Sequence, residues 1–224
     1  METVITAKGV KRGFSTGGGI FWALKGLDMT VEEGKLTILK GRSGSGKTTL
    51  MNILGALDPP TEGDVVFCGE SIGRIGEHRR DRIRRRDMGF VFQSVALVSM
   101  MTAFENVEFI LRISGYPLRE RKARVEACLN MVGLGARMNH MTQELSGGEQ
   151  QRVAIARAIA HKPKVIFADE PTAELDTNTG LQVVKIFKDL VEHENATIVM
   201  TTHDPGLMDA ADKVYELEDG EIVS

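Results

Sequence analysis

The segment from Gly41 to Thr49 reads GRSGSGKTT and combines three glycines with a lysine and several hydroxyl groups. Glycines let successive backbone N–H groups turn toward phosphate oxygens, Lys47 can reach the outer phosphates, and the Thr48 hydroxyl can ligate magnesium. A glycine-rich turn alone is usually only a turn, but here a predicted strand precedes it and a predicted helix follows it, which favours a phosphate loop. Its predicted binding residues are Gly41, Ser43, Gly44, Ser45, Gly46, Lys47, Thr48 and Thr49.

Two carboxylates follow an apolar run, VIFADE, at residues 165–170. Because the carboxyl ends of parallel strands form the ligand-binding edge of a sheet, Asp169 and Glu170 are predicted to face the nucleotide. Asp169 can hold the magnesium shell, and Glu170 can orient the attacking water or accept its proton. The alternative is that the Asp-Glu-Pro sequence merely ends the strand and caps a loop.

His203 ends the next predicted strand, TIVMTT, one helix further along the chain. A right-handed crossover returns the tip of that strand to the same edge of the sheet. A single histidine at a strand end is more often structural than catalytic. Its expected place beside the two carboxylates nevertheless favours a polar contact with the γ-phosphate.

The segment LSGGE, which ends at Glu149, is a second glycine loop that opens on a helix N-terminus. A helix N-terminus can bind an anion, so the chain has two candidate anion sites for one nucleotide. Simple phosphate-loop kinases and small GTPases do not need the second, and the residues alone leave its purpose open.

The elements that must position these groups alternate along the chain. Hydrophobic periodicity predicts strands at residues 2–7, 27–31, 36–39, 64–68, 88–92, 165–168 and 197–201, with a terminal hairpin turning at 219–220. It predicts helices at residues 47–57, 78–86, 103–114, 117–133, 149–160 and 179–191. This alternation indicates an α/β fold with a mainly parallel sheet covered on both faces, and the strand-free stretch 95–145 is predicted to be a helical insert.

The composition limits the possible classes of protein. The 224 residues suffice for one substantial domain, and 42% hydrophobic with 26% charged residues indicate a packed core. A balance of 28 basic against 31 acidic residues argues against a protein that coats nucleic acid. Cys68 and Cys128 form neither a disulfide framework nor a zinc site, which favours a reducing cytoplasm. No apolar stretch approaches the roughly 20 residues of a membrane span, so we expect another chain to supply any membrane anchor.

Six motifs, taken in order, resemble those of the ATP-binding subunit of ATP-binding-cassette (ABC) transporters, and the resemblance covers nearly the whole chain. They are the Walker A loop GRSGSGKT, Gln93 of the glutamine loop in FVFQ, the signature LSGGEQQRVAIARA, the Walker B strand VIFADE, the D-loop ELD with Asp176, and the switch histidine His203 in TTHD. The resemblance implies one ABC ATPase domain at 1–224. Its P-loop NTPase (RecA-like) core lies at about 1–94 and 146–224, with an N-terminal antiparallel β subdomain, and its α-helical subdomain lies at about 95–145.

In that family two cassettes pack head to tail, and each ATP lies between the Walker A loop of one chain and the signature loop of the other. The resemblance therefore implies ATP and Mg²⁺ as cofactors and a second copy of this chain as partner. Further nucleotide contacts are implied for Ser146, Gly147, Gly148, Glu149 and Asp176. The implied catalytic residues are Lys47, Gln93, Glu170 and His203. The implied magnesium ligands are Thr48, Gln93 and Asp169.

Family members also place an aromatic ring from an N-terminal strand on adenine, and Phe14 occupies the corresponding position. An aromatic residue in such a strand is otherwise usually part of the core. Trp22 is a competing candidate for the adenine contact.

Two other segments are compatible with partner contacts. The apolar residues at 95–101 can pack within the helical insert, or they can contact a permease, since methionine adapts to irregular partners. The arginine-rich stretch 78–87 is predicted to be a solvated helix rather than a lipid or nucleic-acid patch.

Segments such as LMNILGALDPPTEGDV and ADEPTAELDTNTG resemble the ATPases of lipoprotein-release, macrolide-export, cell-division and antimicrobial-peptide-resistance systems. The implied partner is an integral membrane permease, and the implied location is cytoplasmic, at the inner face of the cell membrane. The chain departs from this branch at 96–101 and at Met141, where proline is frequent, and at Ala173 and Glu174, where glycine and asparagine are frequent.

Three functions are compatible with these residues. The first is an ATPase subunit that powers a membrane transporter, and the motif set favours it. The second is a regulatory module that senses ATP in a membrane complex without transport. The third is a cassette ATPase acting on DNA or ribosomes, which would usually carry two cassettes, coiled coils or zinc insertions. No nucleic-acid partner is expected.

Overall fold

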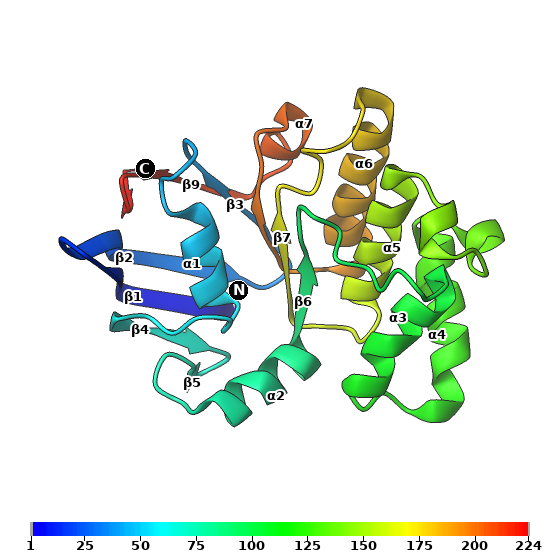
Figure 1. Cartoon of the computed structure of the whole chain (residues 1–224), viewed down its shortest axis with the longest axis horizontal. Helices are drawn as coiled ribbons and strands as arrows, with labels where there is room; N and C mark the ends of the chain where they lie inside the picture. The colour runs from blue at the N-terminus through cyan, green and yellow to red at the C-terminus, as the bar shows by residue number, and fades with distance from the viewer. Residues whose placement is uncertain (1, 224) are drawn as a thin grey trace.

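A six-stranded, mainly parallel sheet forms the centre of the structure, a computed structural model that describes residues 2–223 (Figure 1). Its strands, in order across the sheet, are β10 (Glu221–Ile222), β9 (Lys213–Glu218), β3 (Leu36–Lys40), β8 (Ile198–Thr201), β7 (Val165–Asp169) and β6 (Met88–Val91). All neighbouring strands are parallel except β9 and β10, which form the predicted terminal hairpin. The carboxyl ends of β3, β7 and β8 therefore meet at one edge of the sheet.

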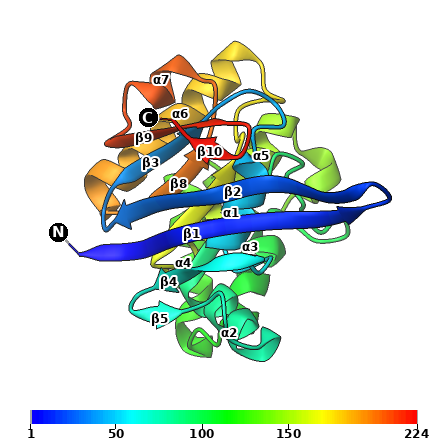
Figure 2. The same cartoon turned by 90° about the vertical axis from the view of Figure 1, so that its left-hand side faces the viewer.

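A second sheet is antiparallel and contains the N-terminal strands. Its order is β2 (Gly19–Glu32), β1 (Thr3–Thr16), β4 (Glu62–Phe67) and β5 (Glu70–Ser71). Strands β1 and β2 form one long hairpin along a side of the molecule, with the turn extending past the other elements (Figure 2). The α/β fold class, with an antiparallel N-terminal sheet beside a mainly parallel one, is confirmed.

This hairpin is much longer than predicted, because the hydrophobic pattern indicated strands only at 2–7 and 27–31. Register shifts interrupt the pairing of β1 with β2, one of them between Ala7 and Val10. Each shift breaks the alternation of inward- and outward-facing side chains on which the prediction depended. The pairing nevertheless continues across these irregularities from Thr3 to Thr16.

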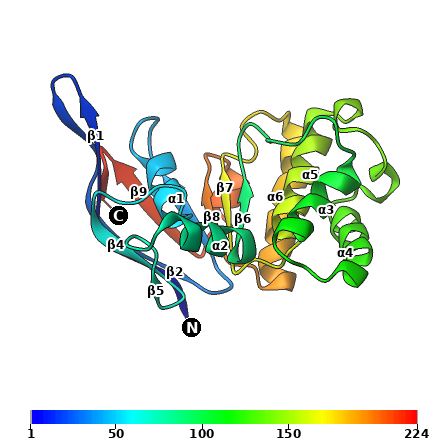
Figure 3. The ribbon, with the colours of Figure 1, turned by 60° about the horizontal axis from the view of Figure 1, so that its bottom comes forward.

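Helices cover both faces of the six-stranded sheet. Helix α1 (Lys47–Leu54) lies between the two sheets, whereas α3 (Ala103–Ile113), α4 (Leu118–Met131), α5 (Gly147–Ile159) and α6 (Thr177–Glu194) lie beyond the other face (Figure 3). Successive side chains of β7 pack on opposite faces of the sheet. Phe167 packs in the cluster that contains α1, and Ile166 and Ala168 pack in the cluster that contains α5 and α6. Burial on both faces is typical of a parallel sheet.

Most helices begin and end within a few residues of the prediction. Helix α1 ends three residues early because Gly55 caps it and Ala56 adopts a positive φ of 56°. Helix α5 begins two residues early because Ser146 is its N-cap. The short elements β5 and α7 (Pro205–Met208) were not predicted, since they are too brief to show a periodic pattern. Among the described residues, no helix is both long enough and apolar enough to cross a bilayer.

The described stretch between β6 and α5 contains α3, α4 and two 3₁₀ turns (Gly135–Arg137 and Thr142–Glu144), and no strand. Helix α3 begins with a capping box in which Thr102 and Glu105 satisfy each other's backbone N–H groups. Buried side chains of α3 and α4 pack in the same cluster as α5. The helical insert thus lies against the helix that follows the LSGGE loop.

Helix α2 (Glu77–Asp87) carries the arginine-rich segment on the surface. Four of its arginines form ion pairs, which join Arg79 to Glu70, Arg80 and Arg84 to Glu77, and Arg85 to Asp81. Carboxylates of the same chain thus neutralise much of the positive charge of α2. This pairing favours the interpretation of α2 as a solvated helix.

Candidate active site

One cavity at the carboxyl ends of the parallel strands gathers most of the predicted nucleotide-binding residues. Its volume is about 460 Å³. It is lined by Phe14, Phe21, Ala23, Ser43, Gly44, Gly46, Lys47, Thr48, Thr49, Gln93, Asp169, Glu170 and His203. These residues come from β1, β2, the phosphate loop and the ends of β6, β7 and β8, so distant segments meet at this edge of the sheet.

The phosphate loop joins β3 to α1, and its backbone needs glycine at Gly46. This residue has a φ of 104°, and a Cβ atom there would lie 2.8 Å from both the Ala23 carbonyl oxygen and a Leu24 methyl carbon. The Lys47 side chain is buried, and its Nζ donates to the carbonyl oxygens of Gly41, at 2.6 Å, and Arg42, at 3.0 Å. The ammonium group therefore lies within the curve of the loop.

Two predicted binding residues of this loop do not line the cavity. The place that a Cβ atom of Gly41 would take is occupied by the Leu217 carbonyl oxygen and the Ser45 hydroxyl oxygen. The Ser45 side chain is itself buried. Gly41 and Ser45 thus pack on the side of the loop away from the cavity. Ser43, Gly44 and Gly46 form its concave face.

Asp169 lies between two threonine hydroxyls. Its Oδ1 accepts a hydrogen bond of 2.6 Å from Thr201 Oγ1, and its Oδ2 accepts one of 3.4 Å from Thr48 Oγ1. The Thr201 hydroxyl oxygen also accepts a hydrogen bond of 2.9 Å from the Glu170 backbone N–H. Thr201 is fully buried at the end of β8 and was missed in the sequence, although the parallel pairing of β7 with β8 places it opposite Asp169.

Glu170 adopts a left-handed backbone conformation with a φ of 45°, which is unusual for a residue other than glycine. Hydrogen bonds from its N–H to Thr201 hold this conformation. Its Oε1 lies 3.3 Å from Nε2 of His203, whose side chain is 61% exposed. The carboxylate and the imidazole are therefore adjacent and both face the cavity.

The aromatic residues of the hairpin divide between two faces. Phe14 pairs with Phe21 across the hairpin, and both line the cavity. Trp22, next to Phe21 in the same strand, points to the opposite face and does not line the cavity. The Arg12 guanidinium lies 4.8 Å from the centre of the Phe14 ring. Phe14 thus lines the cavity and stays the predicted adenine contact, and Phe21 is an additional candidate.

The LSGGE loop lies outside this cavity. Ser146 and Gly147 are exposed at the start of α5, where Ser146 and Glu149 form a capping box. The Ser146 N–H that donates to Glu149 holds the pKa of that carboxyl below its usual value. Glu149 is therefore committed to the helix cap within its own chain.

Asp176 of the ELD segment also lies outside the cavity and caps α6. Its carboxylate accepts hydrogen bonds from the backbone N–H groups of Asn178 and Thr179 and, at 2.6 Å, from the Thr179 hydroxyl. The hydroxyl is the main reason why the pKa of Asp176 lies below its ordinary value. Asp176 lines a neighbouring cavity of about 380 Å³ that shares Glu170 and His203 with the first.

Gly148 is needed for packing. A Cβ atom there would clash with the side chain of Thr179 on α6, whereas a Cβ atom at Gly147 would meet open space. We expect Gly148→Ala to lower the free energy of unfolding by about 1–3 kcal/mol, the usual cost of overpacking. Urea unfolding measures this, with Gly147→Ala as the control that should change little. Equal stability of the two variants would contradict the close contact of α5 with α6.

Comparison with known proteins agrees with this geometry. The model of a family described as ABC transporter matches residues 24–173. The chain is 45% identical over 220 residues to the ABC transporter ATP-binding protein MJ1508 of Methanocaldococcus jannaschii, with 98% of each chain covered. It is 43% identical to the macrolide export ATP-binding/permease protein MacB of Wolinella succinogenes, over 99% of this chain and 34% of MacB. The predicted resemblance to cassettes of the macrolide-export type is thereby confirmed.

Among solved structures, a dimeric post-hydrolysis state of the ATP-binding cassette MJ0796 bound to ADP and Pi superimposes with a TM-score of 0.90. Its sequence is 39% identical, and the superposition covers 98% of this chain and 97% of that one. Family, fold and residue pattern agree along nearly the whole length. The chain therefore belongs to the ABC transporter family of ATP-binding proteins and is an ABC-type ATPase cassette.

Proposed function

We propose that this chain hydrolyses ATP at a site that a second copy of the chain completes, and that the resulting dimer drives or gates a membrane permease. One observation carries the proposal. The phosphate loop, the acidic pair, Gln93 and His203 line one cavity, whereas Ser146 and Gly147 lie outside it on an exposed helix N-terminus. A helix N-terminus suits phosphate, so the exposed loop is available to an ATP held by another copy.

Each residue of the cavity has a role in this proposal. Lys47 and the loop N–H groups hold the β- and γ-phosphates, because their positive ends converge on the concave face of the loop. Glu170 orients the attacking water and accepts its proton, and His203 contacts the γ-phosphoryl group as negative charge shifts during transfer. Phe14 stacks on adenine from the hairpin.

The donor set at the edge of the sheet suits Mg²⁺. Thr48, Gln93 and Asp169 would hold the ion, since all three offer oxygen atoms and line the same cavity. Magnesium is commonly bound by few protein ligands together with substrate phosphates. When bound, the ion neutralises charge on the phosphate oxygens. Thr201 keeps the Asp169 carboxylate oriented, because its hydroxyl donates to Oδ1.

Charge at Ser146 tests the shared site. Ser146→Asp and Ser146→Asn have nearly the same shape, and both residues cap helices well, so α5 should form in either variant. Only aspartate places a negative charge beside the γ-phosphate of the partner's ATP, and like charges in contact cost several kcal/mol. We expect Ser146→Asp to raise the dimer dissociation constant in ATP by roughly tenfold or more, whereas Ser146→Asn changes it much less.

Sedimentation velocity measures the monomer–dimer equilibrium, and a Glu170→Gln background keeps ATP intact during the run. The absence of any ATP-dependent dimer in that background would refute the shared site. Equal dimerisation of the two Ser146 variants would remove the signature loop from the proposed interface.

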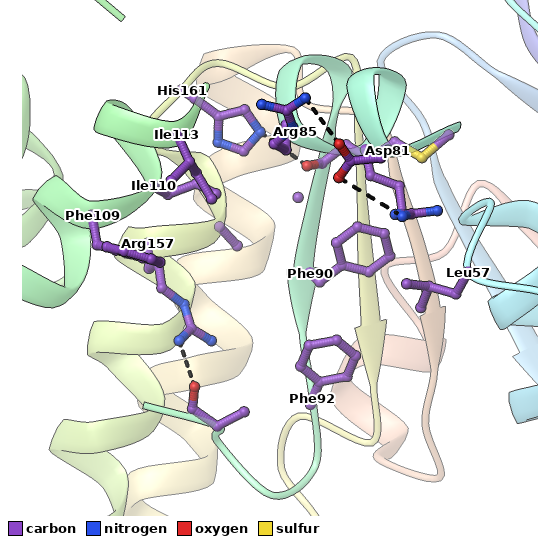
Figure 4. A pocket seen from close by; sticks show the side chains of 15 residues that line it. Leu57, Asp81, Arg85, Phe90, Phe92, Phe109, Ile110, Ile113, Arg157 and His161 are labelled. Carbon is purple, nitrogen blue, oxygen red and sulfur yellow. Dashed lines mark hydrogen bonds and ion pairs between the residues drawn. The ribbon is translucent and has the colours of Figure 1, made fainter. Parts of the chain in front are cut away.

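An apolar groove is the proposed contact for the permease. Its volume is about 320 Å³, and its walls come from α2, β6, α3 and α5 (Figure 4). Exposed aromatic side chains, Phe92 and Phe109, line it together with Ile113. In MacB, as its name states, ATP-binding and permease parts belong to one protein, and this chain spans about a third of it. We infer that a membrane permease fills the groove and holds this chain at the inner face of the cell membrane.

Export, lipoprotein release and resistance to antimicrobial peptides are the transport classes that we consider for this cassette. A complex that only senses ATP is the alternative. Purification of the cassette together with an integral membrane permease, followed by an assay of substrate movement in vesicles, separates these functions. ATP hydrolysis coupled to substrate movement would favour a transporter, and ATP-dependent association without any movement would favour a regulatory complex.

A further inference from the structure

The glutamine loop contains two consecutive residues in a left-handed backbone conformation. Val95 has a φ of 42° and Ala96 a φ of 49°, and neither is glycine. A β-branched residue such as valine rarely adopts this conformation. The Ala96 N–H donates to the Ser94 carbonyl oxygen, which closes a tight turn around Val95. Surrounding structure must therefore hold this turn.

Arg157 supplies that support from α5. Its Nη1 donates to the Ala96 carbonyl oxygen at 2.6 Å, and its Nη2 donates to the Val95 carbonyl oxygen at 3.2 Å. Figure 4 shows the guanidinium extending from the helix to the loop, with a dashed line marking the shorter bond. The forked guanidinium thus holds two successive carbonyl groups in one orientation.

This guanidinium has no compensating carboxylate among the described residues. Burial lowers the pKa of Arg157, and no neighbouring acid opposes the shift. Most of the charged side chains on α2 have partners, by contrast. Arg157 is half-buried and carries no ion pair in the described part of the chain. Its two bonds to the carbonyls of the left-handed turn therefore point to a role in placing the loop.

The loop held by Arg157 begins at the nucleotide cavity. Gln93 lines that cavity, two residues before Val95 and three before Ala96. A change in the φ and ψ angles of Val95 would alter the path of the chain on either side of it, including the segment that carries Gln93. The turn therefore directly follows the segment that carries the Gln93 amide into the cavity.

We propose that Arg157 is a positioning residue for ATP hydrolysis, which keeps Gln93 in the nucleotide cavity by holding the Val95–Ala96 turn in its left-handed conformation. The inference rests on the proposed role of Gln93. Helix α5 would then have two roles. Its N-terminus presents Ser146 to the ATP of the partner, and Arg157 near its C-terminus holds the glutamine loop of its own chain.

Arg157→Met tests the inference, since methionine retains an apolar stem in the groove and removes both bonds. A matched control is Arg124→Met, because Arg124 also donates to two successive carbonyl oxygens, those of Ile159 and Ala160, each at 2.8 Å. Those carbonyls belong to the end of α5 itself, and the Arg124 hydrogen bonds do not reach the glutamine loop. The purified full chain is assayed for ATPase kcat, for KM and for thermal unfolding.

We expect Arg157→Met to lower kcat about 10- to 100-fold, the usual cost of misplacing a group at an active site. KM for ATP should change little, because the phosphate loop is untouched. In a Gln93→Ala background, Arg157→Met should lower kcat by less than about twofold, because the group that it positions is already absent. Arg124→Met should have the same small effect in both backgrounds.

The double-mutant cycle of Arg157→Met and Gln93→Ala separates this inference from the proposed function. If Gln93→Ala lowers kcat but Arg157→Met lowers it by an equal factor with and without Gln93, Arg157 acts only on general stability and the inference is wrong. If Gln93→Ala itself leaves kcat unchanged, the proposed role of Gln93 fails and the inference fails with it. Should Arg157→Met not fold, Arg157→Lys replaces it, since lysine keeps the charge but cannot hold two carbonyls in a planar fork.

Discussion

Glu170→Gln should bind ATP and accumulate as a dimer, while its kcat falls by about 10²- to 10⁴-fold, the usual contribution of a general base. Glutamine has nearly the same shape but cannot accept the proton of the attacking water. The left-handed backbone and the bonds to Thr201 should be retained, because they involve only the main chain of residue 170. Phosphate release under ATP saturation measures the loss, and sedimentation velocity measures the dimer.

Glu174→Gln is the matched control. Glu174 is exposed, lies four residues further along the chain and lines neither cavity. It should hydrolyse ATP at the parental rate. Parental turnover in Glu170→Gln as well would show that Glu170 is not the catalytic carboxylate, and loss of ATP binding in that variant would point to a role in the ground state instead.

Lys47→Ala should weaken the binding of ATP itself. Removal of one partner of a buried, charged hydrogen-bonded pair typically costs 2–5 kcal/mol, which corresponds to a rise in Kd of roughly 30-fold or more. Lys47 is buried in the curve of the phosphate loop, and no second lysine is among the described residues that line the cavity. A titration with a fluorescent ATP analogue gives Kd directly.

Lys40→Ala controls for a general loss of positive charge near the loop. Lys40 ends β3, pairs with Glu216 at 3.3 Å and does not line the cavity. Its removal should leave Kd within about twofold, because exposed ion pairs contribute little. Since Lys47 also bonds to loop carbonyls, thermal unfolding must accompany the titration. An unchanged Kd in a folded Lys47→Ala protein would contradict the phosphate-loop assignment.

The sequence was sufficient to predict the α/β fold class and the segments that carry polar groups. The phosphate loop depends on contiguous residues between a strand and a helix, and its glycines are required locally by positive φ angles such as that of Gly46. Asp169 and His203 could be brought to one edge because parallel strands and right-handed crossovers leave few alternatives. The phosphate loop is a local feature, and the meeting of strand ends follows from general rules of topology. Both can therefore be inferred once the strands and helices have been predicted.

The length of the N-terminal hairpin required the tertiary structure. Bulges break the alternation along β1 and β2, and only the pairing of the two strands restores a continuous ladder. The same register decides that Phe14 and Phe21 share the face of the cavity while Trp22 does not. A shift of one residue would reverse those faces, and composition cannot distinguish the two outcomes.

Contacts between distant segments likewise appear only in the folded chain. Thr201 orients Asp169 across two strands, Gly148 makes room for Thr179, and Arg157 holds a turn that lies about 60 residues earlier in the sequence. Each depends on side-chain direction and packing distance between elements, which no repeating pattern of residue types encodes. The sequence alone therefore identified the chemical groups, and the packing of strands and helices decided which of them meet.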